Sequence, residues 1–324
     1  MKKTILSVIL LSLAVLVQGQ SVGKMDFKAE GFTQKKFNNA EKRIFIQHFN
    51  VNYQTVMVSY AKAGRGFKHG TAQAGLALGL DGVTDAQLQQ MTDRYYKDFV
   101  SKLEGAGFSI MTADEVKEFD HFSDWEKIEG GTPMMDVQAT GYLTTLPTGF
   151  TALDGGAGAF NLGGQPESKK LGGAIVVRVN ITVPFAESQE TNGGLVGGVA
   201  KIVAKNDLRL SPQESIPVKG DFKKPKLLYT NITFGYKESL KWQAMYTGKL
   251  KKPIEIEDIL DEKKKYKATS VATTGSGFTG RYSEAYAEKA QLVACDPAKY
   301  EKGVDQAING YLSASLEGFL KYIK

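Results

Sequence analysis

Hydrophobic and polar side chains alternate over two segments in the middle of the chain. From Ala174 to Phe185 the apolar residues fall on one parity and the polar residues on the other, and Leu227 to Tyr236 repeats the pattern. Both segments contain the triplet Asn-Ile-Thr, at residues 180–182 and 231–233. A period of two residues is typical of a strand with one buried face. The two segments are therefore predicted to be neighbouring strands with matched polar faces.

Other segments carry the strand signal less regularly. The alternation from Arg43 to Tyr60 changes phase near Gln54, which predicts a β-bulge or two strands joined by a tight bend. Shorter strands are predicted at Phe108 to Met111 and at residues 241–252, 266–274 and 281–295. The later part of the chain is thus expected to be antiparallel in character.

Apolar residues spaced three and four apart predict helices in the first half of the chain. The clearest helix runs from Thr84 to Leu103, and Thr84 with Gln87 fits a capping box at its start. A second capping box, Thr112 with Glu115, opens a shorter helix. The apolar stripe of the first helix is interpreted as core packing.

Two further helices are predicted towards the C-terminus. Ile254 to Lys265 begins acidic and ends basic, which complements a helix dipole and indicates a solvated helix. The last helix has Asp296 as its cap and Pro297 in its first turn. Its apolar stripe comprises Val304, Ile308, Leu312, Leu316, Phe319 and Ile323. A stripe of this length predicts a helix that belongs to the core.

These elements together predict a mixed α/β (α+β) fold, in which amphipathic helices pack on a sheet that carries glycine-rich loop insertions. Residues 20–40 are a polar lead-in, mobile or strapped down, and residues 41–324 form a single domain. Glycine and proline cluster near residues 154–173 and 186–226, where long loops are predicted.

The first nineteen residues have the pattern of a signal peptide. Lys2 and Lys3 precede an uncharged apolar run from Ile5 to Val17, and Gly19 fits the last position before cleavage. The run is shorter than the roughly 18 residues that a spanning helix needs. We expect cleavage before Gln20 and an exported chain of periplasmic, outer-membrane-associated or secreted location.

Composition restricts the classes of function. The net charge of +6 is mild for 324 residues, and two of those charges lie in the signal peptide, so a nucleic-acid binder is not predicted. The basic patches at residues 223–226 and 249–252 are interpreted as surface, with peripheral contact to acidic envelope components as an alternative. Cys295 is the only cysteine, so no intramolecular disulfide forms. It is interpreted as a small buried apolar residue.

Several short motifs suggest chemistry that their surroundings do not support. Residues 275–280 match GxGxxG, but no helix pattern follows and too little chain remains for a dinucleotide-binding sheet. The match is interpreted as a hairpin turn. Ser59 and Lys62 match SxxK without its companion motifs. The histidines His48, His69 and His121 are too scattered for a zinc site, and His48 is interpreted as structural. No catalytic, cofactor-binding or metal residue is predicted, and no cofactor.

The order of the elements resembles the α/β domain of envelope proteins of the TolB amino-terminal, LpoB and CsgG group. The similarity lies in an opening strand at Arg43 to Tyr60, a long helix at Thr84 to Leu103 and a closing helix at Val304 to Ile323, and in no signature motif. It implies a periplasmic interaction or pore-assembly unit without catalytic residues, with an envelope or outer-membrane complex as partner. We therefore expect a non-catalytic binding or assembly component of the bacterial envelope. The alternatives are an accessory subunit of an outer-membrane secretion or transport pore, and a hydrolase of unfamiliar type.

Overall fold

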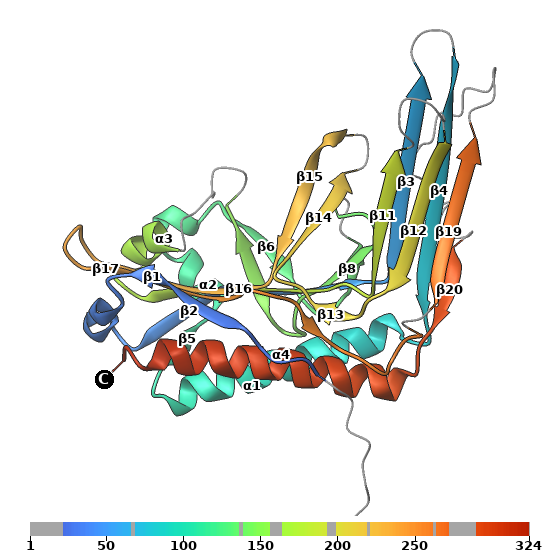
Figure 1. Ribbon diagram of the computed structural model, residues 1–324. Helices are drawn as coiled ribbons and strands as arrows, with labels where there is room; N and C mark the ends of the chain where they lie inside the picture. The colour runs from blue at the N-terminus through green and yellow to red at the C-terminus, as the bar shows by residue number, and fades with distance from the viewer. Residues whose placement is uncertain are drawn as a thin grey trace, which may run out of the picture.

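A computed structural model describes residues 22–65, 69–135, 139–155, 164–192, 199–218, 221–261, 264–271 and 290–323. Its centre is an eight-stranded sheet, crossed on one side by two long helices (Figure 1). In spatial order the strands are β1 (Phe27–Phe32), β17 (Gln243–Leu250), β16 (Asn231–Lys237), β10 (Ile175–Val183), β2 (Arg43–Gln54), β8 (Tyr142–Thr145) and β7 (Met134–Met135), and β5 (Ser109–Met111) pairs with β2. The described part of the polar lead-in is held against the sheet. It contains β1, which pairs with β17, and the 3-10 helix Gln34–Asn39.

The predicted pair of alternating strands is confirmed at the middle of this sheet. β10 runs antiparallel to β16, and Asn180 lies opposite Asn231, so the two Asn-Ile-Thr triplets start from one cross-strand pair. The side-chain amide of Asn180 donates to the Asn231 side-chain oxygen at 3.4 Å. On its other side β10 runs parallel to β2, and its apolar residues, among them Val179 and Ile181, are fully buried.

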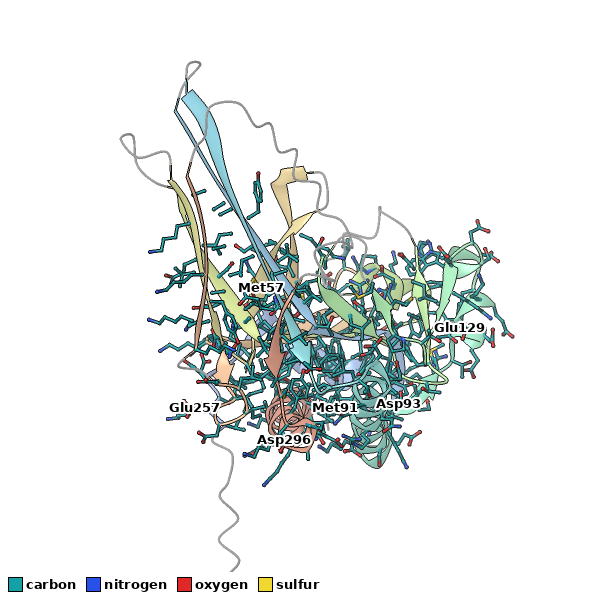
Figure 2. All side chains as sticks on the ribbon, turned by 90° about the vertical axis from the view of Figure 1, so that its right-hand side faces the viewer. Met57, Met91, Asp93, Glu129, Glu257 and Asp296 are labelled. Carbon is teal, nitrogen blue, oxygen red and sulfur yellow. The ribbon has the colours of Figure 1, made fainter. Side chains whose placement is uncertain are left out.

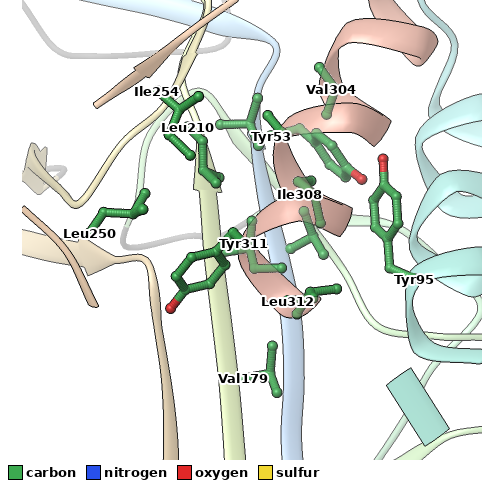
Figure 3. Packing of buried hydrophobic residues seen from close by; sticks show 14 of the residues in the cluster. Tyr53, Tyr95, Val179, Leu210, Leu250, Ile254, Val304, Ile308, Tyr311 and Leu312 are labelled. Atoms are coloured by element: carbon green, nitrogen blue, oxygen red, sulfur yellow. The ribbon is translucent and has the colours of Figure 1, made fainter. Parts of the chain in front are cut away.

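Helices α1 (Asp85–Gly105) and α4 (Pro297–Leu320) cover one face of the sheet (Figure 1). Both start where the sequence predicts. The Thr84 hydroxyl accepts from the Gln87 backbone N–H at 3.2 Å, and the Asp296 carboxylate accepts from two backbone N–H groups of α4. Ile308 and Leu312 of α4 point towards the strands, as Figure 3 shows. Each such side chain contributes roughly 1.5–3 kcal/mol by burial, so α4 belongs to the core.

The opposite face of the sheet carries a smaller apolar cluster. It is covered by α2 (Ala113–Lys117), the 3-10 helix Asp120–Phe122 and α3 (Gln165–Lys170), beside the two-stranded antiparallel sheet of β6 (Glu126–Glu129) and β9 (Thr151–Asp154). Phe45 of β2 and Val176 of β10 point into this cluster, since they alternate with the residues that face the long helices. The capping box of Thr112 and Glu115 is confirmed at the start of α2.

Two three-stranded sheets project from the central sheet, away from α1 and α4 (Figure 1). One contains β3 (Val56–Arg65), β4 (His69–Asp81) and β20 (Gln291–Ala294), and the other contains β11 (Ala186–Asn192), β12 (Val199–Asn206) and β19 (Lys265–Val271). β11 and β12 pack against β3 and β4. Small and medium side chains fill the space between them, including Ala61 and Leu76 on one side and Ala200, Ile202 and Ala204 on the other. We call this two-layer element the projecting sandwich.

The expected balanced α/β fold is wrong, because the chain is mostly β and builds several separate sheets. The main cause is the segment near residues 186–226, which is predicted as a long loop. In its described part it forms β11, β12, β13 (Arg209–Leu210), β14 (Gln213–Val218) and β15 (Asp221–Tyr229). Alanine, glycine and short polar residues resemble loop composition, yet they suit strands whose neighbouring layer approaches closely.

The charged helix predicted from Ile254 to Lys265 is also wrong. Ile254 and Glu255 form the strand β18, which pairs with β13. Ile254 and Ile256 are both 2% exposed, so burial here follows a period of two rather than that of a helix. Asp258 then has a φ of 63°, in the left-handed region, which a continuous α-helix does not contain.

The change of phase near Gln54 is confirmed as a break between two strands. β2 ends at Gln54, and β3 begins at Val56 and enters a different sheet. A similar break divides the predicted strand Leu227 to Tyr236, because Thr230 separates β15 from β16. No helix within the described residues is long and apolar enough to cross a membrane.

Candidate binding groove

A groove of about 500 Å³ opens where the projecting sandwich meets the central sheet. One wall is the start of β3 and β11, and Met57, labelled in Figure 2, lies at the foot of this wall. The other wall is β14, which stands between β15 and β11 in Figure 1. The lining residues are Gln54, Met57, Val58, Thr140, Tyr142, Ala186, Glu187, Ser188, Arg209, Glu214, Ser215 and Ile216.

An unpaired strand edge forms part of the wall. In the described ranges β11 pairs only with β12. Phe185 accepts at its carbonyl from the Asp207 N–H, so this carbonyl faces β12, while the Phe185 N–H donates to the Gln54 side-chain oxygen at 3.0 Å. Backbone groups alternate along an antiparallel strand, and those of Ala186 and Ser188 therefore face the groove. The Gln54 side-chain oxygen accepts from the Ala186 N–H at 3.1 Å, so the edge becomes available from Ser188 onwards.

A buried arginine supports the floor of the groove. The Arg209 side chain is 7% exposed, and its guanidinium donates to Asp207 at 2.8 Å and to Glu214 at 2.7 Å. Burial alone would lower the pKa of Arg209, but the two carboxylates outweigh it and raise the pKa. Arg209 therefore stays charged and joins the start of β13 to β14.

Carboxylates outnumber cations around this arginine. Lys205 pairs with Glu187 at 3.1 Å and with Asp207 at 3.8 Å. Glu255 lies opposite Arg209 in the β13–β18 pair. Partial burial and a hydrogen bond with Asp207 raise the pKa of Glu255 to about 7. Four carboxyl groups thus share two cations.

Hydroxyl groups line the groove at Thr140, Tyr142, Ser188 and Ser215, and no histidine is among the lining residues. Burial raises the pKa of Tyr142 well above its usual range, and Glu214 adds to the effect. A phenol in this state does not act as a general base at neutral pH.

The structure covers the short motifs noted in the sequence only in part. Ser59 is buried in β3, and the side chain of Lys62, at the other end of the SxxK match, lies outside the described residues. Residues 275–280, the GxGxxG match, lie outside the described residues.

The histidines are dispersed through the fold. His48 lies in β2, where burial and the positive charge of Arg178 lower its pKa to about 4. His69 begins β4, and His121 lies in the 3-10 helix Asp120–Phe122 with its ring against Phe122 and Trp125. Within the ranges that the structure covers, no group of three or more His, Cys, Asp or Glu residues is placed to hold a metal ion.

Cys295 is half-buried between β20 and α4. Burial and the nearby Asp296 raise the pKa of its thiol to about 12, so the reactive thiolate is scarce at neutral pH. Of the basic patch at residues 249–252, Lys249 pairs with Glu30 and Lys251 with Asp26. These two lysines stabilise the edge strand β1 and its lead-in.

Compared with protein-family models, with curated protein sequences and with solved structures, the chain gives no significant match. The sequence did not indicate the groove either. Its charged residues belong to the segment predicted as a loop and to the segment predicted as a helix, and only the pairing of β13 with β18 brings them together. A feature of the sequence that could have indicated the groove is the close spacing of the charged residues Asp207, Arg209 and Glu214 around β13.

Proposed function

We propose that this chain is an exported, non-catalytic component of the bacterial envelope that binds or assembles with another protein. The observation that carries the proposal is the edge of β11, which no strand among the described residues pairs, beside an open groove on a sandwich that projects from the helix-covered body. Unpaired strand edges attract further strands, and proteins normally blunt or cover them. An edge left beside a groove is therefore a natural docking position for a partner.

The chemistry of the groove supports binding over turnover. Its arginine is held by two carboxylates, and its phenol keeps its proton at neutral pH. The signal-peptide pattern of the first nineteen residues supports export, and the resemblance in element order to envelope domains supports an assembly role.

Crosslinking in the native host tests this proposal. The chain carries a C-terminal tag, and cells are fractionated, crosslinked and analysed by mass spectrometry. We expect the chain in the envelope fraction with an N-terminus at Gln20 and a reproducible crosslinked partner. A chain that begins at Met1 and stays in the cytoplasm would contradict the proposal. So would turnover in a panel of ester, glycan and peptide substrates, which the hydrolase alternative predicts.

A second candidate is an accessory subunit of an outer-membrane secretion or transport pore. It is supported by the outer face of the sheet that contains β3, β4 and β20. Val56 and Val58 are partly exposed there, Gly79 and Ala77 lie opposite them, and Leu292 is 63% exposed. An outward apolar face favours contact with another apolar surface. Co-fractionation with one outer-membrane complex would favour this candidate over a free periplasmic binding protein.

A further inference from the structure

We propose that the groove accepts an extended segment of a partner polypeptide, which adds as a strand to the outer edge of β11 and places a basic side chain beside Glu187 and Glu214. This inference rests on the proposed function, because it names the chemistry of the partner. Three conditions must hold. The backbone of β11 must be accessible, the opposite wall of the groove must be a poorer partner for an added strand, and the charge of the groove must favour one kind of peptide.

The backbone of β11 supplies the first requirement. The N–H and C=O groups of Ser188 face the groove by alternation from Phe185, whose carbonyl faces β12. Ser188 is also a lining residue of the groove. Main-chain hydrogen bonds of this kind give affinity in strand addition, and side-chain pockets give specificity.

The opposite wall of the groove, β14, offers a poorer edge for strand addition than β11. The carbonyl of Pro212 accepts from the Thr230 N–H, so alternate positions of β14 face β15 and Ser215 faces away from it. Two residues further on, Pro217 lies at an irregularity of the pairing with β15 and has no N–H to donate. Proline on a strand edge discourages pairing. A peptide segment in the groove can therefore form a more continuous series of backbone hydrogen bonds with β11 than with β14.

Charge selects a basic segment. Glu187 and Glu214 line the groove, and Asp207 and Glu255 lie behind Arg209, with Lys205 as the second cation. Glu187 already pairs with Lys205 and Glu214 with Arg209. A further cationic side chain beside them gains attraction because the carboxyl groups of this cluster outnumber its cations. An isologous pairing of β11 with β11 of a second copy, in the register that sets Glu187 opposite Glu187, would instead bring two carboxylates together, which is unfavourable. The preferred occupant is a different polypeptide.

Two labelled octapeptides test this inference on the mature chain. One alternates Val and Lys and the other alternates Val and Glu, and binding is followed by fluorescence anisotropy. We expect saturable binding of the Val-Lys peptide and Kd at least about tenfold weaker for the Val-Glu peptide, which corresponds to about 1.4 kcal/mol. Equal binding of both peptides, or of neither, would overturn the proposal.

Two substitutions test the contribution of backbone hydrogen bonds and that of charge separately. Ser188→Pro removes the edge donor and should weaken binding of the Val-Lys peptide about tenfold or more, whereas the control Ser188→Ala keeps the donor and should bind like the parent. Glu187→Gln should reduce the preference for Lys over Glu. If Ser188→Pro does not fold, a Val-Lys peptide that is N-methylated at alternate residues tests the backbone bonds on the parent chain, and undiminished binding would refute strand addition.

The same variants distinguish this inference from the proposed function. Sedimentation of the parent and Ser188→Pro shows whether a second copy occupies the edge, and a parent oligomer that dissociates in the variant would replace the proposed occupant by a copy of this chain. If the envelope partner crosslinks equally to Ser188→Pro, the proposed function stands and the groove inference fails. If no partner crosslinks to either chain, the proposed function fails as well.

Discussion

The phenol of Tyr311 in α4 donates a hydrogen bond of 2.8 Å to the backbone carbonyl of Gly248 in β17. The helix approaches the strand closely here, since a Cβ on Gly248 would lie 2.7 Å from the Ser315 hydroxyl. Two turns further on, Phe319 stacks on Phe234 of β16 with ring centroids 3.8 Å apart. Three features therefore position the last helix on the sheet: a hydrogen bond, a glycine that allows close approach, and the stacking of two rings.

Shortening an apolar side chain in this interface should destabilise the protein. Leu316 is 2% exposed, so Leu316→Ala is expected to lower the free energy of unfolding by about 2–5 kcal/mol. Urea unfolding followed by circular dichroism measures the change. Glu317→Ala, on the exposed side of the same turn, is the matched control and should change stability by less than about 0.5 kcal/mol. Equal effects of the two substitutions would contradict the described seat of α4.

Two glycines of α4 should respond to alanine with opposite signs. A Cβ on Gly310 meets nothing within 4 Å, so Gly310→Ala should stabilise the helix by about 0.4–1 kcal/mol. A Cβ on Gly318 would lie 2.1 Å from the hydroxyl of the fully buried Tyr246, so Gly318→Ala should destabilise it. Thermal unfolding of the two variants in parallel measures both changes.

A double variant identifies the cause of the Gly318 effect. The Tyr246 hydroxyl is buried and has no hydrogen-bond partner among the described residues. Tyr246→Phe alone should therefore be neutral or stabilising, and it should remove most of the cost of Gly318→Ala. If the costs of the two substitutions simply add, the close contact with the hydroxyl is not the cause.

His48 should make the protein less stable in mild acid. Burial first, and the positive charge of Arg178 second, lower its pKa to about 4, while Asp154 opposes the shift. An unfolded chain has a histidine pKa near 6.5, so between about pH 6.5 and 4 the unfolded state binds the extra proton. Stability is therefore full above this range and falls by up to about 3 kcal/mol as the pH decreases through it. In His48→Gln the free energy of unfolding should depend less on pH over this range. In the control His121→Gln, at an exposed position, it should depend on pH as in the parent.

Glu255 should act in the opposite direction. Its pKa is raised to about 7, so the folded state holds this proton more tightly than the unfolded state and loses stability as the pH rises from about 4.5 through 7. Glu255→Gln should therefore be more stable than the parent at pH 8 and similar to it at pH 5. Denaturant unfolding at both values measures the difference. Glu257→Gln, two residues away and exposed, should follow the parent at both, and a parallel gain in this control would refute the assignment to Glu255.

Local patterns determined the two long helices and the alternation of the central strands. The starts of α1 and α4 follow from Thr84 and Asp296, because a cap satisfies backbone donors of residues that are adjacent in sequence. The one-sided burial of β10 and β16 follows from their alternation of apolar and polar residues. These features depend on neighbours within about one helical turn or one strand, so the sequence alone displays them. The repeated triplet suggested that the two strands are neighbours, and the fold pairs them through Asn180 and Asn231.

Only the tertiary structure decided that β4, β11 and β12 are strands. β4 is rich in glycine and alanine, which have low strand propensity, and the three strands form because two layers of small side chains pack together and extend the main core. The tertiary structure also replaced the predicted charged helix by β18, because burial of Ile254 and Ile256 outweighs the pattern of surface charge.

The groove likewise depends on distant parts of the chain, as Gln54 meets Ala186 across 132 positions and Arg209 lies opposite Glu255. Contacts between segments so far apart have no period in the sequence, since they are fixed by which surfaces the folded chain brings together.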